Sequence, residues 1–356
     1  MKKTLTFLLC AILVLSMLMG TLVSCTTTDG TGDNGDTENS GDAGNTDEKE
    51  AQYLEALEKL SNGDYTGAYE AFKSLGDYLD CQARLDKFVY FPSVVNYDLS
   101  DRSGVMTVTL GENNLPSNIV SNGVLGKKIG TYTYAANGNL KKQKMTYNGD
   151  ELEYAYTHDL SNNLIKAENS VNGTVLAVYD YSYDPQGRLE FEFYTENGVI
   201  KNDCNYYYDS NGNLIKLEEN TPDVDYVYNY VYDADGYKIS ERGEATNGNW
   251  YTKEFSYDAE GKLTKERYTE GDSLYIITYT YDDAGNCIKA ERTHEDGSVD
   301  VITKEYDANG NAIKEVSTSA DGSVETVETQ YVLTYLEIDV PEQTMELLGA
   351  ILTITT

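Results

Sequence analysis

Histidine, tryptophan and proline are scarce in this sequence, which has 2 His, 1 Trp and 5 Pro among 356 residues. His158 stands at a tyrosine position of a repeat and His294 precedes an Asp-Gly turn, so neither is expected to be catalytic. The GxSxG, HExxH, P-loop and GxGxxG motifs are missing. Carboxylate pairs occur by chance in a chain with 60 acidic residues, so they identify no glycosidase site. We therefore expect no enzymatic activity, no cofactor and no metal.

Cysteine is also limited, and the sequence has no CxxC pair. Cys10 lies in the apolar leader described below. The three residues Cys81, Cys204 and Cys287 are widely separated, which indicates neither a zinc site nor a disulfide framework. We expect these three to be small buried thiols.

Positive charge is the third shortage, because 27 basic residues face 60 acidic residues and the formal net charge is −33. The longest basic run is Lys141-Lys142-Gln143-Lys144. A chain with this balance repels nucleic acid and anionic head groups. We expect no nucleic-acid partner.

Residues 1–24 have the features of a signal peptide. Lys2 and Lys3 precede an apolar stretch that is too short to span a membrane, and Leu22-Val23-Ser24-Cys25 follows. These four residues resemble the lipobox of bacterial lipoproteins. The resemblance implies cleavage before Cys25, a lipid on the Cys25 sulfur, and anchoring at the extracytoplasmic face of the cell membrane. Loss of the leader's two lysines takes the net charge from −33 to about −35.

Two segments follow the leader. Residues 25–49 combine the lipidated cysteine with a Gly-, Asp- and Thr-rich stretch that is typical of a disordered acidic tether. Residues 50–88 show helical spacing of apolar residues on either side of Asn62-Gly63-Asp64, and Asp64 can cap the second helix. The segment GDYTGAYEAFKSLGDY resembles a tetratricopeptide-type helical hairpin, of which little more than one repeat is present.

A repeat of 24–25 residues dominates the rest of the chain. Its unit Tyr-Asp-x-x-Gly-Asn-Leu-Ile-Lys starts at positions 134, 158, 183, 208, 232, 257, 281 and 306, and decayed copies lie near Thr109 and Tyr331. Each unit has a second turn midway, such as Asn172-Gly173 or Asn197-Gly198, and these pairs supply the positive φ of tight hairpins. We therefore predict a mainly β protein, an antiparallel meander of repeated hairpins preceded by a small helical hairpin. Its parts are a transitional β segment with a degenerate first repeat (89–130), the repeat domain (131–335) and a C-terminal cap (336–356).

The Tyr-Asp-x-x-Gly-Asn/Arg-Leu motifs resemble the YD-repeat, or RHS-repeat, family. The resemblance covers roughly 200 residues. It implies a repetitive β-sheet. Large members of the family enclose a C-terminal toxin, and this chain has too few repeats for that.

Tyrosine is abundant, with 32 residues, and 13 of them form two columns on one face of the predicted sheet. One column runs through the motif positions, and the other lies two residues earlier at Tyr132, Tyr156, Tyr181, Tyr206, Tyr230, Phe255, Tyr279 and Lys304. Ile165, Ile215, Ile239, Ile288 and Ile313 are expected on the opposite face, which leaves open whether the sheet closes, coils or stays open. The columns are interpreted as cross-strand packing, or alternatively as an aromatic track for a sugar polymer or extended peptide. The candidate ligand-contact residues are Tyr181, Tyr206, Tyr230 and Tyr279.

The sequence favours a non-catalytic, lipid-anchored surface protein that binds or interacts through its repeats. Its expected partners are the membrane, through the lipid, and a surface glycan or protein. A carbohydrate-binding lipoprotein that uses the tyrosine columns is the second interpretation, and an unrecognised extracellular hydrolase is the third.

Overall fold

The computed structural model describes residues 43–354, except 125 and 148. The chain divides into two compact units, and each is described by itself. The sheet unit contains residues 92–111 and 116–331. The helical unit contains the described residues of 43–91, 112–115 and 332–354. The predicted signal peptide, Cys25 and residues 26–42 of the predicted tether lie outside the described residues.

The helical unit begins with a hairpin of α2 (Ala43–Ser61) and α3 (Tyr65–Leu75), followed by the short α4 (Cys81–Leu85). Asp64 caps α3 as expected, because its carboxylate accepts a hydrogen bond from Gly67 N–H at 3.0 Å. The hydrophobic core of this unit consists of the buried side chains of Ala56, Ala68, Phe72, Leu75 and Cys81. The helical hairpin is confirmed, while its tetratricopeptide-like character stays a prediction. The same unit contains α5 (Glu342–Ile354), within the predicted C-terminal cap.

Helix α2 corrects the predicted end of the tether, because residues 43–49 are helical and not part of a disordered segment. The cause is cooperative helix growth. Once Tyr53, Leu57 and Leu60 pack on the core, each further residue adds a hydrogen bond without a new nucleation cost. Polar residues with weak helix propensity can therefore extend the helix toward its N-terminus.

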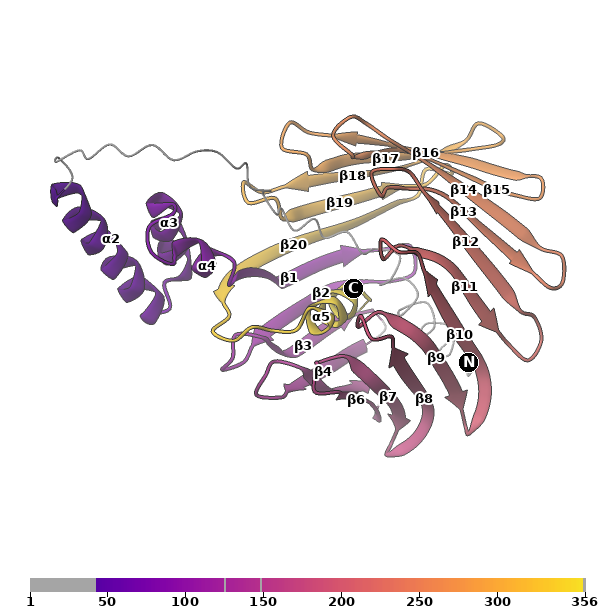
Figure 1. Ribbon diagram of the computed structural model, residues 1–356, viewed down its shortest axis with the longest axis horizontal. Coiled ribbons are helices and arrows are strands. Elements are labelled where there is room, and N and C mark those ends of the chain that lie inside the picture. The colour runs from indigo at the N-terminus through magenta and orange to yellow at the C-terminus, as the bar shows by residue number, and fades with distance from the viewer. Residues whose placement is uncertain (1–42, 125, 148, 355–356) are drawn as a thin grey trace. The chain divides into compact units, whose positions relative to one another are not determined.

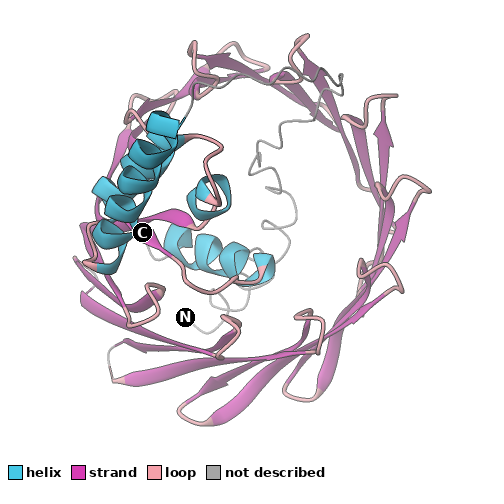
Figure 2. Cartoon of the chain, turned by 60° about the vertical axis from the view of Figure 1, so that its left-hand side comes forward, coloured by secondary structure: helices cyan, strands magenta, loops and turns pink. Residues whose placement is uncertain are grey.

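The sheet unit is built on one antiparallel sheet of 20 strands, each paired with the next along the chain (Figure 1). Strand β20 also pairs with β1, so the meander closes on itself, and Figure 2 shows the strands arranged as a ring. The prediction of a mainly β meander of hairpins is confirmed. The strands are β1 (Phe88–Asp98), β2 (Ser103–Leu110), β3 (Pro116–Gly123), β4 (Gly126–Tyr134), β5 (Leu140–Tyr147), β6 (Asp150–His158), β7 (Leu164–Val171), β8 (Thr174–Tyr183), β9 (Leu189–Glu196), β10 (Val199–Tyr208), β11 (Leu214–Asn220), β12 (Tyr226–Tyr232), β13 (Lys238–Ala245), β14 (Trp250–Tyr257), β15 (Leu263–Glu270), β16 (Ser273–Tyr281), β17 (Cys287–His294), β18 (Val299–Tyr306), β19 (Ala312–Thr318) and β20 (Val324–Tyr335).

The closed sheet includes both ends of the repeat region. Residues 89–130, predicted as a transitional β segment with a degenerate first repeat, form β1 to β3 and part of β4 of this sheet. The two ends of the meander pair with each other. Ser93 Oγ donates to the Gln330 carbonyl at 3.0 Å, and Ser100 N–H donates to Glu325 at 2.7 Å across this closure.

Each motif coincides with a β-bulge, because the pairing register shifts immediately before its first residue. The shifts occur at Leu110, Tyr134, His158, Tyr183, Tyr208, Tyr232, Tyr257, Tyr281 and Tyr306. The first repeat therefore starts at Leu110, one residue after the predicted Thr109. Asn114 has a φ of 59° at the place where Asn162 or a glycine has positive φ in the later repeats, which supports this register.

The two faces of the sheet differ in exposure. The face that carries both tyrosine columns, here called the tyrosine face, contains the buried Tyr132, Tyr181 and Tyr206. On the opposite face, Ile215, Ile239 and Ile313 are each more than a third exposed. The tyrosine face is therefore the more buried of the two, and it also carries the buried apolar side chains of Leu140 and Leu164, which pair with motif positions. In the part of the chain that the structure describes, no helix has both the length and the apolar character needed to cross a membrane.

Candidate functional site

The motif tyrosines hold successive repeats together. Each hydroxyl donates to the backbone carbonyl of the residue that pairs with the preceding motif position, over 2.5–3.1 Å. We call these bonds tyrosine clasps. They are made by Tyr134, Tyr183, Tyr208, Tyr232, Tyr257, Tyr281, Tyr306 and Tyr331. Tyr331 thus keeps the structural role of the motif although the sequence around it has lost the pattern. The first column therefore acts as a structural ladder between repeats.

In seven motifs the second residue is an aspartate that closes its own turn. Its carboxylate accepts from the backbone N–H groups two and four residues later, over 2.8–3.1 Å, at Asp159, Asp184, Asp209, Asp233, Asp258, Asp282 and Asp307. Side-chain and backbone hydrogen bonds from Asn286 lower the pKa of Asp282. These aspartates act as turn residues. Among the described residues, no group of three or more His, Cys, Asp or Glu side chains could hold a metal ion.

The second column contains the four candidate ligand-contact residues, which lie on separate strands and form no single cluster. Tyr181 and Tyr206 are both 8% exposed, whereas Tyr230 and Tyr279 are half-buried. Across the strands, Tyr181 pairs with Glu192 and Tyr230 with Glu241. The structure therefore places acidic side chains among the tyrosines, which the column pattern did not indicate.

Glu192 on β9 connects two of the candidate tyrosines. It is 9% exposed, faces Tyr181 across the strand pair, and accepts a hydrogen bond from the Tyr206 hydroxyl at 3.1 Å. Burial raises its pKa to about 6, the Tyr206 hydrogen bond opposes this rise, and the charge of Glu219 adds to it. Within the described part of the chain, the buried Tyr181 hydroxyl has no hydrogen-bond partner. Glu192 is thus a carboxyl group that can change its charge near neutral pH.

Glu241 on β13 has the opposite electrostatic environment although it is only 2% exposed. Burial alone raises its pKa, but the hydrogen bond from Lys238 and the charges of Lys238 and Lys253 produce a net lowering. The Lys238 nitrogen lies 2.9 Å and the Lys253 nitrogen 3.7 Å from the carboxylate, and the Tyr251 hydroxyl donates at 2.8 Å. This buried charge is fully partnered, which is typical of a structural group.

Tyrosine rings also cross the strands in a row on the tyrosine face. Tyr226, Tyr228, Tyr251, Tyr268 and Tyr275 are linked by ring-centroid distances of 4.7–6.3 Å. Gly243 lies between Tyr228 and Tyr251, and a Cβ on this glycine would lie 2.3 Å from the Tyr251 ring. In the closest pair, Tyr268 and Tyr275, the planes differ by 10°. Ring faces that stack on one another are not available as a platform for sugar, so this row supports the packing interpretation.

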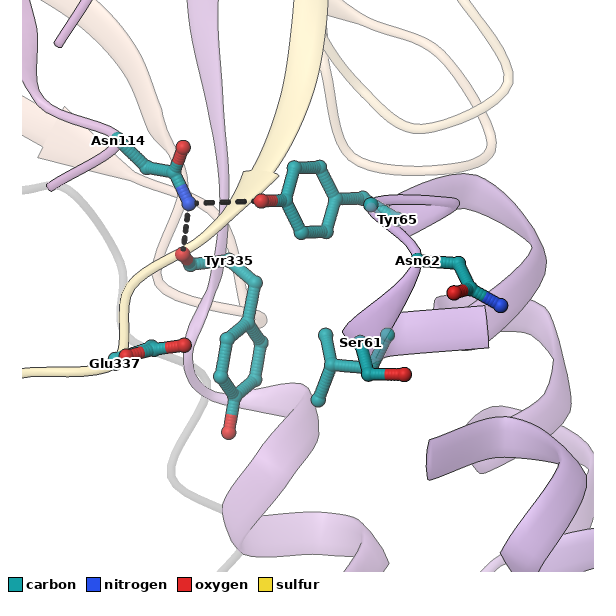
Figure 3. A pocket seen from close by; sticks show the side chains of 8 residues that line it. Ser61, Asn62, Tyr65, Asn114, Tyr335 and Glu337 are labelled. Carbon is teal, nitrogen blue, oxygen red and sulfur yellow. Dashed lines mark hydrogen bonds between the residues drawn. The ribbon is translucent and has the colours of Figure 1, made fainter. Parts of the chain in front are cut away.

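A pocket of about 330 Å³ lies in the helical unit. Three segments that are distant in sequence form it: the turn after α2, the loop at Asn114, and the chain around Tyr335 (Figure 3). The Asn114 side-chain amide joins these segments, because it donates to the Tyr65 hydroxyl and to the Tyr335 carbonyl, each at 2.9 Å. Sequence reasoning missed this site. The only signal was Asn114, an asparagine in place of the usual glycine.

Comparison with known proteins gives one match to a family and several distant structural likenesses. Residues 98–309, more than half of the chain, match the family described as Teneurin YD-shell. No curated protein matches the chain.

A chain in the crystal structure of TcdB2-TccC3-Cdc42 is 16% identical with a TM-score of 0.41, over 69% of this chain and 16% of that one. Porin-like proteins from Bacteroides uniformis and Bacteroides vulgatus are 10% and 9% identical, with TM-scores of 0.35 and 0.28. Each match covers 68% of this chain, and 98% and 99% of the respective porin-like chain. At these TM-scores, none of the three likenesses bears on function.

Proposed function

Because the chain belongs to the Teneurin YD-shell family, we propose that it is a lipid-anchored, non-catalytic protein of the cell surface whose closed repeat sheet is a scaffold for binding. The observation that carries the scaffold role is the use of the motif residues. The tyrosine hydroxyls clasp neighbouring repeats, and the aspartates close their own turns. A motif that is fully occupied in holding the sheet together gains stability and not chemistry from its repetition.

The proposed anchor rests on the sequence around Cys25. A lipobox-like segment ends an apolar leader, and a polar tether follows it before the first helix. One cysteine-linked diacylglyceryl group carries two chains, which is enough for stable membrane attachment. The tether then gives the folded units reach at the extracytoplasmic face.

The anchor is tested by expressing the full chain in a bacterial host with an alkyne-labelled fatty acid. We expect labelling of the wild type, partition into detergent, and loss of both in Cys25→Ser. Cys81→Ser is the matched control, since Cys81 is a free, buried thiol, and its labelling should persist. An unlabelled wild type, or equal labelling of Cys25→Ser, would refute the anchor.

Carbohydrate binding is the second candidate function. Tyr230 and Tyr279 support it because both rings are only half-buried on the tyrosine face. The test is an array of glycans and wall polymers, probed with the wild type and with Tyr206, Tyr230 and Tyr279 replaced by Ala. Selective binding that is lost in a still-folded variant supports the sugar track. Unfolding of the variant, together with no binding by the wild type, assigns these tyrosines to the core.

A further inference from the structure

We propose that the pocket of the helical unit binds a single neutral sugar ring. This inference deepens the binding role proposed above and rests on it. It places the ligand on the helical unit instead of the tyrosine columns. The lining residues that carry the argument are Leu60, Tyr65, Asn114, Tyr335 and Glu337.

The pocket is held in shape by hydrogen bonds that do not involve a ligand. Asn114 uses its amide hydrogens on Tyr65 and on the Tyr335 carbonyl, so the loop, α3 and the end of β20 are fixed together. Asn114 adopts a φ of 59°, a backbone conformation that costs energy for a residue other than glycine. Next to it, the Leu336 N–H donates to the Lys87 carbonyl at 2.9 Å and fixes the chain beyond Tyr335. A site that is already organised loses little entropy when it binds.

The lining offers hydrogen-bond donors, acceptors and apolar surface. These groups complement the hydroxyl and C–H groups of a sugar ring. The Tyr65 hydroxyl accepts from Asn114 and keeps its own hydrogen for donation. Glu337 offers carboxylate oxygens as acceptors, and Figure 3 shows its side chain beside Tyr335. Leu60 and the largely buried Tyr335 ring, which packs edge-on against Phe88, are the apolar part of the lining that faces the C–H groups of the sugar.

The charge of the lining selects a neutral ligand. Among the described residues that line the pocket, none is lysine or arginine, and Glu337 is the single charged side chain. In a chain with a net charge of −33, such a site repels phosphate, sulfate and acidic sugars. A cation gains little, because Glu337 is exposed and ion pairs with a hydrated carboxylate are weak.

The volume limits the ligand to one ring. About 330 Å³ lies at the lower end of the range of roughly 300–1,000 Å³ that is typical of small-molecule pockets. A polymer can therefore insert only its terminal unit. The ligand is a free monosaccharide or the end of a glycan, and matched probes of both kinds distinguish these sources.

The test is a calorimetric titration of the full chain with glucose, galactose, mannose and N-acetylglucosamine, and with oligosaccharides that end in each sugar. We expect at least one neutral sugar to bind, and glucuronate to bind about tenfold more weakly than glucose if glucose is bound. Glu337→Gln and Tyr65→Phe should each weaken binding by about tenfold, because Glu337 and the Tyr65 hydroxyl are the two polar groups assigned to the ligand. Glu337 is exposed, so its variant is expected to fold normally. Tyr207→Phe, on the opposite face of the sheet, is the matched control and should bind like the wild type.

Four results would overturn the pocket assignment. They are binding of no sugar, equal binding by wild type and Glu337→Gln, equal binding of glucose and glucuronate, and sugar binding that the tyrosine-column variant alone abolishes. Under the last result, the proposed surface-binding function survives and only the site changes. If the chain binds no glycan, wall polymer or surface protein at all, the proposed function fails together with the pocket.

Discussion

Removal of one tyrosine clasp should lower the free energy of unfolding by about the contribution of one partly buried hydrogen bond. In Tyr232→Phe the ring stays, and the hydrogen bond of 2.9 Å to the Leu214 carbonyl is lost. Tyr232 is half-buried, and its burial raises the pKa of the hydroxyl, so the lost bond lies in a partly dehydrated environment. The substitution leaves a backbone acceptor short of one donor without creating a large cavity.

The expected loss is about 1–2 kcal/mol. A net protein hydrogen bond contributes roughly 0.5–1.5 kcal/mol, and a buried group left unsatisfied costs roughly 1–3 kcal/mol. For a cooperative unit of 150–250 residues, 1 kcal/mol corresponds to about 2–4 °C in Tm. Differential scanning calorimetry of the chain should therefore show a decrease of about 2–8 °C, and urea unfolding should show a lower midpoint with an unchanged slope.

The matched control is Tyr207→Phe, at the residue directly before the motif tyrosine Tyr208. Tyr207 is 43% exposed, and its hydroxyl donates to the Glu218 carboxylate at 2.8 Å on the opposite face. Tyr207→Phe should change the free energy of unfolding by no more than about 0.5 kcal/mol, as is usual for surface substitutions. Equal losses in both variants, or no loss in Tyr232→Phe, would refute the structural role assigned to the clasps.

Three further substitutions test the interior of the tyrosine face. Burial raises the pKa of Glu192 to about 6 in the folded state, above its usual 4.5. Between these two pH values the carboxyl ionises in the unfolded chain but stays protonated in the folded protein. The free energy of unfolding therefore falls as pH rises through this range. Glu192→Gln should remove this loss of about 2 kcal/mol, and urea midpoints from pH 4 to 7 that run parallel to the wild type would contradict it. Glu241→Gln should cost about 3 kcal/mol at pH 7 in the same assay, because it leaves two lysine ammonium groups without their buried partner. Gly243→Ala should cost about 1–3 kcal/mol by displacing the Tyr251 ring, and an unchanged near-ultraviolet circular dichroism spectrum would show that the ring stays in place.

The repeat architecture could be predicted from sequence because its signals are local. Asn172 and Asn197 have positive φ together with the glycines that follow them, as the Asn-Gly pairs indicated. Strand and turn alternate within 24–25 residues, so the hairpin meander follows from the spacing alone. The β-bulges could not be predicted from sequence, because a bulge depends on the register between two strands and the sequence of one strand does not determine that register.

The candidate site was harder to predict because its properties depend on pairs of strands. Tyr181 and Tyr206 were chosen for their column, but it is Glu192 on the intervening strand that joins them. Glu192 and Glu241 look alike in sequence, and only the neighbouring lysines set their pKa values in opposite directions. The pocket at Asn114 brings together residues more than 200 positions apart, a separation at which periodicity carries no information.

Closure of the sheet explains why the terminal repeats could lose their motif. In an open repeat array, the end units face solvent and need polar caps, because unpaired strand edges promote association. Here β1 and β20 satisfy each other's edges through direct pairing. The motif at the C-terminal end is therefore dispensable apart from Tyr331, whose clasp to the Ala312 carbonyl at 3.1 Å still ties the last strand to the repeat before it. Retention of this one tyrosine, where the aspartate and glycine are gone, indicates that the clasp between repeats, and not the turn, is the part of the motif that closure requires.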